Sequence, residues 1–271
     1  MRPITTNSLL VLLFIVLLPS PGALYRPAAP QQALGGTPHW QPALNTSWQI
    51  QYGGTINTGL KVDVYNLDGF ETSRQTVAAL HARGIRVMCY ISAGSFENWR
   101  PDAGKFPSSV LGNTLDGWPN ERWLDIRNLA VLKPILNARM DMCKSKGFDG
   151  VDPDNVEGYA NNSGFALTYQ NQLTFNRYLA AAAHSRGLAI GLKNDLDQIK
   201  DLVGYFDWQL NEQCFEYHEC GKLLPFIKAG KPVFNIEYNL AVAQFCAQAN
   251  AYNFNSLQKR LSLNAYRVAC R

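Results

Sequence analysis

Residues 147–159 read Gly-Phe-Asp-Gly-Val-Asp-Pro-Asp-Asn-Val-Glu-Gly-Tyr, and four of these thirteen residues are acids. A basic run precedes Gly147, as is typical of a glycine that ends a helix. Residues 148–152 then predict a short strand. Pro153 is expected to end that strand, because proline has no N–H to donate to the ladder. The stretch therefore indicates a helix, a tight turn and a strand that leads into an acidic loop.

The acids of this stretch fall on two faces of the predicted strand. Side chains alternate along a strand, so Asp152 and Asp154 share one face and Asp149 takes the other. Two carboxylates presented on one face at a strand end indicate a functional site. A structural network of ion pairs is the alternative interpretation.

The same sequence pattern recurs along the chain: a helical run with a basic residue, a glycine, and then an apolar strand. Its four occurrences are Ala82-Arg83-Gly84, Ser145-Lys146-Gly147, Ser185-Arg186-Gly187 and Lys228-Ala229-Gly230. Such glycines mark the junctions from helix to strand. With the strands between them, eight are predicted: 48–52, 62–66, 85–91, 123–126, 148–152, 188–192, 206–211 and 232–236.

Eight strands that alternate with helices predict an α/β fold, a single (β/α)8 TIM barrel over residues 40–271. The chain has 271 residues, of which 46% are hydrophobic and 17% charged, enough to bury one full core. A doubly wound open sheet is the alternative. No glycine-rich phosphate loop follows the first predicted strand, which favours the barrel.

Residues 1–23 have the pattern of a secretory signal peptide: Arg2, an apolar run over 9–18, and small residues up to Ala23. A membrane anchor is the alternative, but the apolar run is too short to span a bilayer. Residues 24–39 are rich in Pro, Ala, Gln and Gly and are expected to form a flexible linker. We therefore expect a secreted, extracellular protein that has no membrane association after cleavage of the signal.

Charge and cysteine content narrow the function classes further. The formal net charge of +4, without a basic cluster, argues against nucleic acid as a partner. Six cysteines in a secreted chain suggest three disulfides, for which fifteen connectivities exist. A local Cys214–Cys220 loop and a C-terminal Cys246–Cys270 bridge are plausible, which leaves Cys89–Cys143 by elimination. The sequons at Asn45 and Asn161 allow N-glycosylation.

Polar residues gather where the predicted strands end. In chain order these ends are Tyr52-Gly53, Asn66-Leu67-Asp68, Ser92-Ala93-Gly94, Asp125-Ile126-Arg127, Asp152-Pro153-Asp154-Asn155, Lys193-Asn194-Asp195, Asn211-Glu212-Gln213 and Glu237-Tyr238. The active site of a (β/α)8 barrel lies at this end of the strands. Tyr65, Tyr90, Tyr159, Trp208 and Tyr238 are expected near the same rim. Carboxylates, amides and aromatic rings suit a carbohydrate site, and glycosidases cleave with two carboxyl groups.

Most of these residues also allow a structural interpretation. Asp68 and Glu237 could cap helices, Asp125 could pair with Arg127, Lys193 could neutralise Asp152 or Asp195, and the tyrosines could belong to the core. Asp154 and Glu212 lack such an explanation, because each follows a predicted strand directly in a polar stretch. They are the preferred catalytic candidates.

Five ordered motifs resemble glycoside hydrolase family 114, the endo-α-1,4-polygalactosaminidases. They are residues 62–68 (VDVYNLD), 89–94 (CYISAG), 147–155 (GFDGVDPDN), 192–195 (LKND) and 211–214 (NEQC). The resemblance spans residues 40–271. It implies a (β/α)8 barrel that is secreted and cuts α-1,4-linked galactosamine polymers, such as galactosaminogalactan, inside the chain. Carried over by motif, the catalytic carboxylates are Asp154, assigned as the nucleophile, and Glu212, assigned as the acid/base.

The remaining expectations concern binding. The residues expected to bind substrate are Asp68, Tyr90, Asp152, Lys193, Asp195 and Glu237. Since deacetylated galactosamine is cationic near neutral pH, an acidic cleft would attract it. We expect no cofactor, no metal and a monomer. The alternatives are a non-catalytic lectin for the same polymer and a metal-assisted hydrolase with Asp152, Asp154 and Asp195 around Mg²⁺ or Ca²⁺.

Overall fold

The computed structural model of this chain describes residues 37–271. The predicted signal peptide and residues 24–36 of the predicted linker lie outside this range. The largest element is a nine-stranded sheet in the order β1-β2-β3-β7-β8-β9-β10-β11-β12. Its strands are β1 Trp48–Gln51, β2 Val64–Asp68, β3 Arg86–Ser92, β7 Gly150–Asp154, β8 Ala189–Lys193, β9 Trp208–Glu212, β10 Val233–Glu237, β11 Asn255–Gln258 and β12 Val268–Ala269.

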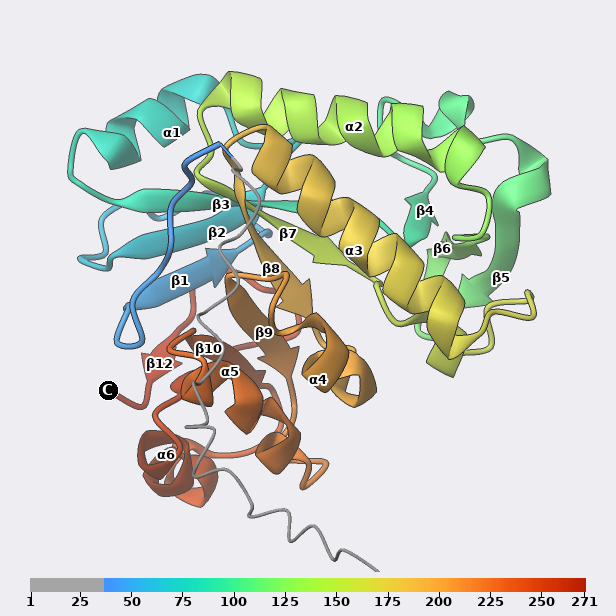
Figure 1. The fold of residues 1–271 in the computed structure, drawn as a ribbon. Coiled ribbons are helices and arrows are strands. Elements are labelled where there is room, and N and C mark those ends of the chain that lie inside the picture. Colours follow the sequence, from blue (N-terminus) through green and yellow to red (C-terminus); the bar gives the residue numbers. More distant parts are fainter. Residues whose placement is uncertain (1–36) are drawn as a thin grey trace, which may run out of the picture. The chain divides into compact units, whose positions relative to one another are not determined.

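The first eight strands of this sheet are parallel, and only β12 runs antiparallel to its neighbour β11. The sheet curls into a barrel, with the helices on its outer face (Figure 1). An apolar cluster that includes Trp48, Trp208 and Phe234 fills part of its interior. Residues from the C-terminal segment cross the seam between β11 and β1. Tyr52 N donates to Leu263 O at 2.9 Å, and Arg267 Nε donates to Trp48 O at 2.8 Å. The predicted (β/α)8 barrel is confirmed.

The helices alternate with strands, as the recurring helix–glycine–strand pattern predicts. They are α1 Arg74–His81, α2 Leu129–Lys146, α3 Tyr169–Ser185, α4 Ile199–Leu202, α5 Leu224–Lys228 and α6 Val242–Ala251, with short 3₁₀ turns at Ala103–Lys105, Ser108–Val110, Gly158–Ala160, Leu196–Gln198 and Cys220–Leu223. Ser73 caps α1 by accepting from Thr76 N at 3.1 Å. Gly147 ends α2 with a left-handed φ of 96°, which a side chain would strain.

One predicted barrel strand was wrong. Residues 123–126 overlap the end of β6 (Trp118–Leu124), which belongs to a separate antiparallel sheet with β4 (Ser95–Glu97) and β5 (Leu111–Leu115). This small sheet is inserted between β3 and α2, beyond the arrowheads of β3 and β7 (Figure 1). The eighth parallel strand is β11, which the sequence reading missed because Asn-Ser-Leu-Gln is short and mostly polar.

The predicted end of the central strand at Pro153 was also wrong. β7 continues through Pro153, which lies in register with Ile91 of β3. The pairing of β7 with β8 covers only Gly150 and Val151. The missing proline N–H therefore interrupts no hydrogen bond to β8, and the strand carries Asp154 one step further out.

A large side chain inside the barrel explains two of its glycines. Trp208 is buried among apolar residues of the strands. A Cβ on Gly191 would lie 2.1 Å from Trp208 Nε1, and one on Gly150 would lie 2.7 Å from the same indole ring. Glycine at both positions gives the indole the space that it needs in the close-packed interior.

Three disulfides join the elements: Cys89–Cys143 links β3 to α2, Cys214–Cys220 closes a loop after β9, and Cys246–Cys270 ties the C-terminus to α6. All three predicted pairings are confirmed. In the part of the chain that the structure describes, no helix combines the length and the apolar character needed to cross a membrane.

Candidate active site

The ends of the parallel strands open into a cavity of about 1290 Å³. Five of the eight predicted site residues line it: Asp68, Tyr90, Asp154, Lys193 and Glu212. Its outer wall comes from the inserted sheet and the segments beside it, with Glu97, Trp99, Trp118, Glu121 and Trp123. Two different parts of the chain, the barrel rim and the insertion, thus enclose one site.

The two catalytic candidates face one lysine. Asp154 ends β7, Lys193 ends β8 and Glu212 ends β9, so the three side chains come from consecutive strands of the barrel. Lys193 Nζ lies 3.0 Å from Asp154 Oδ2 and 3.6 Å from Glu212 Oε2. Lys193 therefore pairs with the candidate carboxylates rather than forming an ion pair with Asp152 or Asp195, as its structural interpretation had suggested.

The lysine is held as an ammonium ion. Its side chain is 2% exposed, and burial alone would lower its pKa. The carboxylates of Asp154, Glu212 and Asp152 outweigh burial and raise the pKa of Lys193 well above its ordinary value. A fixed positive charge thus lies between the two catalytic candidates.

Hydrogen bonds orient the two carboxylates further. Asn155 N donates to Asp154 Oδ1 at 2.8 Å, and the Tyr238 hydroxyl donates to Glu212 Oε1. Asn194 Oδ1 accepts from the backbone N–H of Glu212 at 3.0 Å. Each carboxyl group retains an edge toward the cavity, because the two side chains are 19% and 25% exposed.

Three predicted binding residues do not line the cavity. Asp152 lies beneath it and accepts from Asn66 Nδ2 at 2.7 Å and Tyr52 OH at 3.0 Å. Asp195 accepts from Asn176 Nδ2 at 2.8 Å, and Glu237 accepts from Phe215 N at 3.0 Å. All three are buried. Their position suits support of neighbouring loops and strands rather than direct contact with a ligand.

Burial shifts the pKa values of several carboxyl groups at this end of the barrel. It raises the pKa of Asp152 to about 6, and the adjacent Asp154 adds to this effect. It raises the pKa of Asp195 to about 9 with a further contribution from Glu157, whose own pKa is raised to about 8 by burial and by Asp154. The rim therefore holds more buried carboxyl groups than its cations neutralise.

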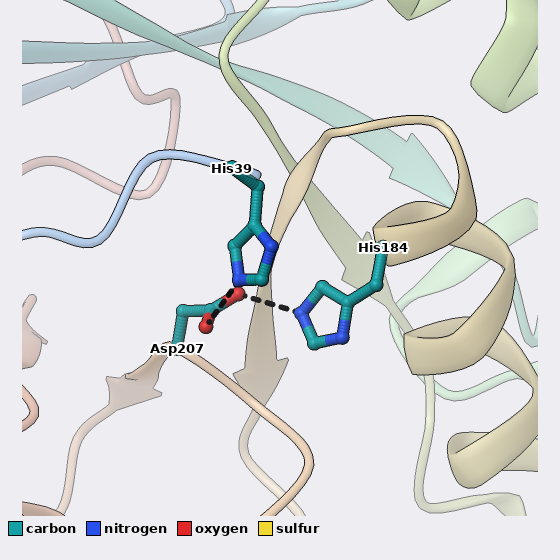
Figure 2. A group of neighbouring side chains, drawn as sticks. All are labelled: His39, His184 and Asp207. Atoms are coloured by element: carbon teal, nitrogen blue, oxygen red, sulfur yellow. Dashed lines mark hydrogen bonds and ion pairs between the residues drawn. The ribbon is translucent and has the colours of Figure 1, made fainter. Parts of the chain in front are cut away.

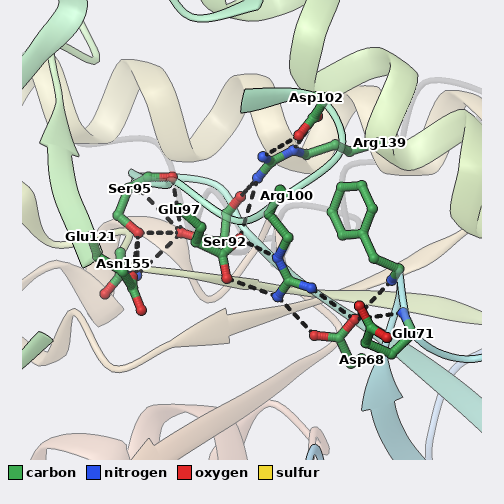
Figure 3. A network of polar contacts seen from close by, with 11 residues as sticks. Asp68, Glu71, Ser92, Ser95, Glu97, Arg100, Asp102, Glu121, Arg139 and Asn155 are labelled. Atoms are coloured by element: carbon green, nitrogen blue, oxygen red, sulfur yellow. Dashed lines mark hydrogen bonds and ion pairs between the residues drawn. The ribbon is translucent and has the colours of Figure 1, made fainter. Parts of the chain in front are cut away.

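The outer wall rests on an arginine network that sequence reasoning missed. Arg100 binds both oxygens of Asp68, at 3.0 and 2.7 Å, and both oxygens of Glu97, at 2.7 and 2.8 Å (Figure 3). Arg139 of α2 binds both oxygens of Asp102, at 2.8 Å each. Asp68 also accepts from the N–H groups of Phe70 and Glu71. It therefore does not cap α1, which begins after Ser73.

A signal for the missed wall was present in the sequence. About thirty residues separate the predicted strands at 85–91 and 123–126, and this connection contains Trp99 and Trp118. Long connections in compact domains are uncommon and often functional. The wall was not predicted, because residues 123–126 were assigned to a strand of the barrel. In the structure, Asp125 instead pairs with Arg127 at 2.7 Å, as its structural interpretation predicted.

The aromatic residues expected near the rim divide into two groups. Tyr90 and Tyr238 line the cavity. Tyr65 and Trp208 are fully buried, and the Tyr65 hydroxyl donates to Asn57 O at 2.8 Å. Tyr159 packs edge-on against Tyr169 outside the cavity lining.

Within residues 37–271, one group of side chains has the donors of a metal site: His39, His184 and Asp207 (Figure 2). It lies at the opposite end of the barrel, because Asp207 precedes β9 and accepts from Ile190 N at the start of β8. The Nε2 atoms of His39 and His184 contact different oxygens of Asp207, at 3.1 and 2.9 Å. The imidazole planes are within 15° of parallel, so their in-plane lone pairs do not converge. This geometry fits hydrogen bonds better than a shared ion.

Asp152, Asp154 and Asp195 form no comparable metal-binding group in the described part of the chain. Asp152 and Asp195 bind different side-chain partners, and Asp154 binds the ammonium group of Lys193. The three carboxylates therefore have separate partners in this structure.

Residues 29–271 match the family model described as glycoside-hydrolase family GH114. Among solved structures, Ega3 from Aspergillus fumigatus, crystallised in complex with galactosamine, is 42% identical, with a TM-score of 0.82 over 86% of this chain and 98% of that one. A comparison with curated protein sequences finds no match.

More distant structures agree in fold alone. The glycoside hydrolase domain of PelA from Pseudomonas aeruginosa is 15% identical, with a TM-score of 0.66 over 82% of this chain and 98% of that one. Eubacterium rectale Amy13B is 11% identical, with a TM-score of 0.53 over 80% of this chain and 65% of that one.

Proposed function

This chain belongs to glycoside hydrolase family GH114, and we propose that it cuts α-1,4-linked galactosamine polysaccharides inside the chain. The observation that carries this proposal is the pair Asp154 and Glu212, held on either side of Lys193 at the mouth of an acidic cavity. Two carboxyl groups at such a position are what glycoside hydrolysis requires.

The charge of the cavity supports an amino-sugar substrate. Eight acids line it (Asp68, Glu71, Glu97, Asp116, Glu121, Asp154, Glu157 and Glu212), against the two cations Arg100 and Lys193. Protonation of Glu121 and Glu157 would still leave an excess of negative charge. A polymer of protonated galactosamine would be attracted to this surface, whereas an anionic polysaccharide would be repelled. Galactosamine is also the ligand named for Ega3.

We assign Asp154 as the nucleophile and Glu212 as the acid/base. Asp154 is the nearer of the two to the ammonium group, which suits a residue that must act as a carboxylate. Since Nζ lies 3.0 and 3.6 Å from their oxygens, Asp154 Oδ2 and Glu212 Oε2 are at most about 6.6 Å apart, the sum of these distances. Carboxyl groups about 5–5.5 Å apart retain anomeric configuration and wider pairs invert it, so this bound favours retention.

The other predicted site residues support this reaction in two ways. Asp68, Tyr90 and Lys193 border the cavity and are proposed to contact the substrate. Asp152, Asp195 and Glu237 are proposed to hold the strand ends and loops that carry the catalytic pair. Glu237, for example, accepts from the N–H groups of Phe215 and Glu216 in the loop after Glu212.

We further propose that the protein acts outside the cell as a monomer without a cofactor. Three disulfides are typical of oxidising compartments such as the extracellular space. The polysaccharide is then its main partner.

The test is release of reducing ends from partly deacetylated α-1,4-galactosamine polymer by the wild type, Asp154→Asn and Glu212→Gln. We expect oligosaccharides from the wild type and a rate loss of about 1,000-fold or more in either folded variant. NMR of the first product should show the α-anomer if configuration is retained. Tight binding of the polymer by the wild type without new reducing ends would instead identify a lectin.

A further inference from the structure

One carboxylate in the wall of the cavity has no cation. Glu121 of β6 is 7% exposed, lines the cavity and accepts one hydrogen bond, from Ser95 Oγ at 2.8 Å. Figure 3 shows it apart from the guanidinium groups of Arg100 and Arg139, which are engaged by other acids. Throughout residues 37–271, no Lys or Arg lies within ion-pair distance of Glu121.

A second polar group in the lining of the cavity has no hydrogen-bond partner within residues 37–271. Tyr90 of β3 is 9% exposed and lines the cavity, and its hydroxyl makes no hydrogen bond to any residue in 37–271. Burial raises the pKa of this hydroxyl, and the charges of Asp154, Glu97 and Glu121 raise it further against the effect of Arg100. Because Tyr90 lines the cavity, a bound ligand can supply a hydrogen-bond partner for this hydroxyl.

An apolar surface completes the pocket. Trp123 lies two residues after Glu121 on the same strand and also borders the cavity, and both side chains are more than nine-tenths buried. Alternation along a strand directs residues i and i+2 to the same face. An indole beside a carboxylate suits a sugar ring that carries a positive charge on one edge.

We propose that Glu121 and Tyr90 form the subsite for the protonated 2-amino group of one galactosamine unit beside the scissile bond. The carboxylate would pair with the ammonium group, and the Tyr90 hydroxyl would accept a further N–H. An N-acetylated unit would bring no positive charge and would leave Glu121 buried and unpaired, so this subsite selects deacetylated units. This inference rests on the function proposed above and assigns a specificity role that the catalytic pair does not have.

The same site predicts that binding releases a proton. Burial, and then Glu97 and Asp154, raise the pKa of Glu121 to about 7 against the effects of the Ser95 hydrogen bond and the more distant charge of Arg100. Near pH 7 the carboxyl group is therefore partly protonated. An incoming ammonium group favours the ionised form, so part of a proton leaves the site when the amino sugar binds.

The first experiment compares Glu121→Gln with the wild type on two oligosaccharides, one fully deacetylated and one with a single N-acetylated unit placed to occupy this subsite. Glutamine can still accept from Ser95, so the wall is preserved. We expect kcat/KM to fall about 10- to 100-fold on the deacetylated substrate and to change less than about 2-fold on the N-acetylated one. Tyr90→Phe should lower kcat/KM on the deacetylated substrate by a smaller factor, again with little change on the N-acetylated one.

Glu219→Gln is the matched control, because it removes one carboxylate that is outside the cavity lining. It should leave both values unchanged. Equal losses by Glu121→Gln on both substrates, or an unchanged selectivity, would overturn the proposal. Thermal unfolding of each variant identifies a loss that is due to misfolding.

The second experiment is calorimetric titration with galactosamine at pH 7 in two buffers that differ in ionisation enthalpy. We expect proton release with the wild type and none with Glu121→Gln. Equal proton release from both proteins would reject the subsite even if the wild type cleaves the polymer. Binding and proton release without any new reducing ends would retain the subsite and reject the proposed hydrolysis. Absence of binding and of cleavage would reject both.

Discussion

The two ends of the barrel differ in whether their buried acids have basic partners. At the end where strands start, Asp207 contacts His39 and His184, and Asp149 contacts His81 at 2.8 Å and Arg86 at 2.6 Å. At the end where strands finish, Glu121, Glu157 and Asp195 have no basic partner within ion-pair distance among residues 37–271. The pKa of Asp207 is lowered, while those of the three rim acids are raised to between about 7 and about 9.

This difference indicates the end of the barrel at which unpaired acids lower the stability of the folded state and are available for binding. A buried acid that has partners stabilises the folded state, and one that has none costs free energy. Such a cost is tolerated where a charged ligand supplies the missing partner. Glu121 and Glu157, which line the cavity, therefore support the proposed cationic substrate.

The largest expected effect on stability concerns Arg100, whose guanidinium pairs with two acids of the rim wall, Asp68 and Glu97. Arg100→Met would leave Asp68 and Glu97 buried without their shared cation. We expect the free energy of unfolding to fall by about 3–5 kcal/mol, measured by urea denaturation. Adding Glu97→Gln should recover part of the loss. A change below about 1 kcal/mol would mean that this wall tolerates unpaired charge as the rest of the rim does.

Asp207→Asn tests the opposite end. It weakens the contacts to both histidines and to Ile190 N, so we expect a loss of about 1.5–3 kcal/mol at pH 7. Burial alone would raise the pKa of Asp207, but the hydrogen bond and charge of His184 outweigh it and lower that pKa below its ordinary value of 3.8. Its stabilising contribution is present above pH 3.8 and is lost as pH falls below it. The variant should therefore lose less stability on acidification than the wild type.

Asp195→Asn should change the stability in the opposite direction. The pKa of Asp195 rises from 3.8 to about 9 on folding, so the folded state is increasingly penalised as pH rises between these values. Asparagine can still accept from Asn176 and tolerates the left-handed backbone of this position, where φ is 47°. We expect the variant to be more stable than the wild type by about 1–2 kcal/mol at pH 8 and equal to it at pH 4. Destabilisation at pH 8 would contradict the account of the rim.

Lys222→Gln is a reference for these buried pairs, because it removes an exposed ion pair. Lys222 lies 2.8 Å from Asp197, and the two side chains are 47% and 65% exposed. Water screens such a pair, so we expect the free energy of unfolding to change by less than about 0.5 kcal/mol. A larger change would show that charge, rather than burial, distinguishes the two ends of the barrel.

Much of the fold was predictable because its signals are local. A basic helix end, a glycine and an apolar strand predict a junction from a few neighbouring residues, and four of the eight barrel strands were located in this way. Three more, at 48–52, 62–66 and 206–211, were assigned between these junctions. The eighth, β11, has only Leu257 as an apolar residue and is buried by its neighbours rather than by its own pattern. The inserted sheet was missed because β5 and β6 are largely polar and exposed.

The candidate site was predictable in part for the same reason. Asp154 and Glu212 follow strands directly, so their place at the rim needed only the strand assignments. Neither the burial of Asp152, Asp195 and Glu237 nor the place of Glu121 in the cavity wall could be predicted from their neighbours in the chain. Each depends on a segment distant in sequence, such as Asn66 for Asp152, 86 residues away.

The sequence by itself thus determined the barrel and the rim on which Asp154 and Glu212 end two strands, and it suggested the three disulfides among fifteen possible connectivities. Only the tertiary structure decided which acids have a cation and which have none. Helix ends and strand alternation are set by adjacent residues, whereas ion pairs depend on distance through space. His39 and Asp207 are 168 residues apart, yet their side chains lie 3.1 Å from each other. Among residues 37–271, Glu121 has no cation within ion-pair distance for the same reason: the fold brings Arg100 to Asp68 and Glu97 instead.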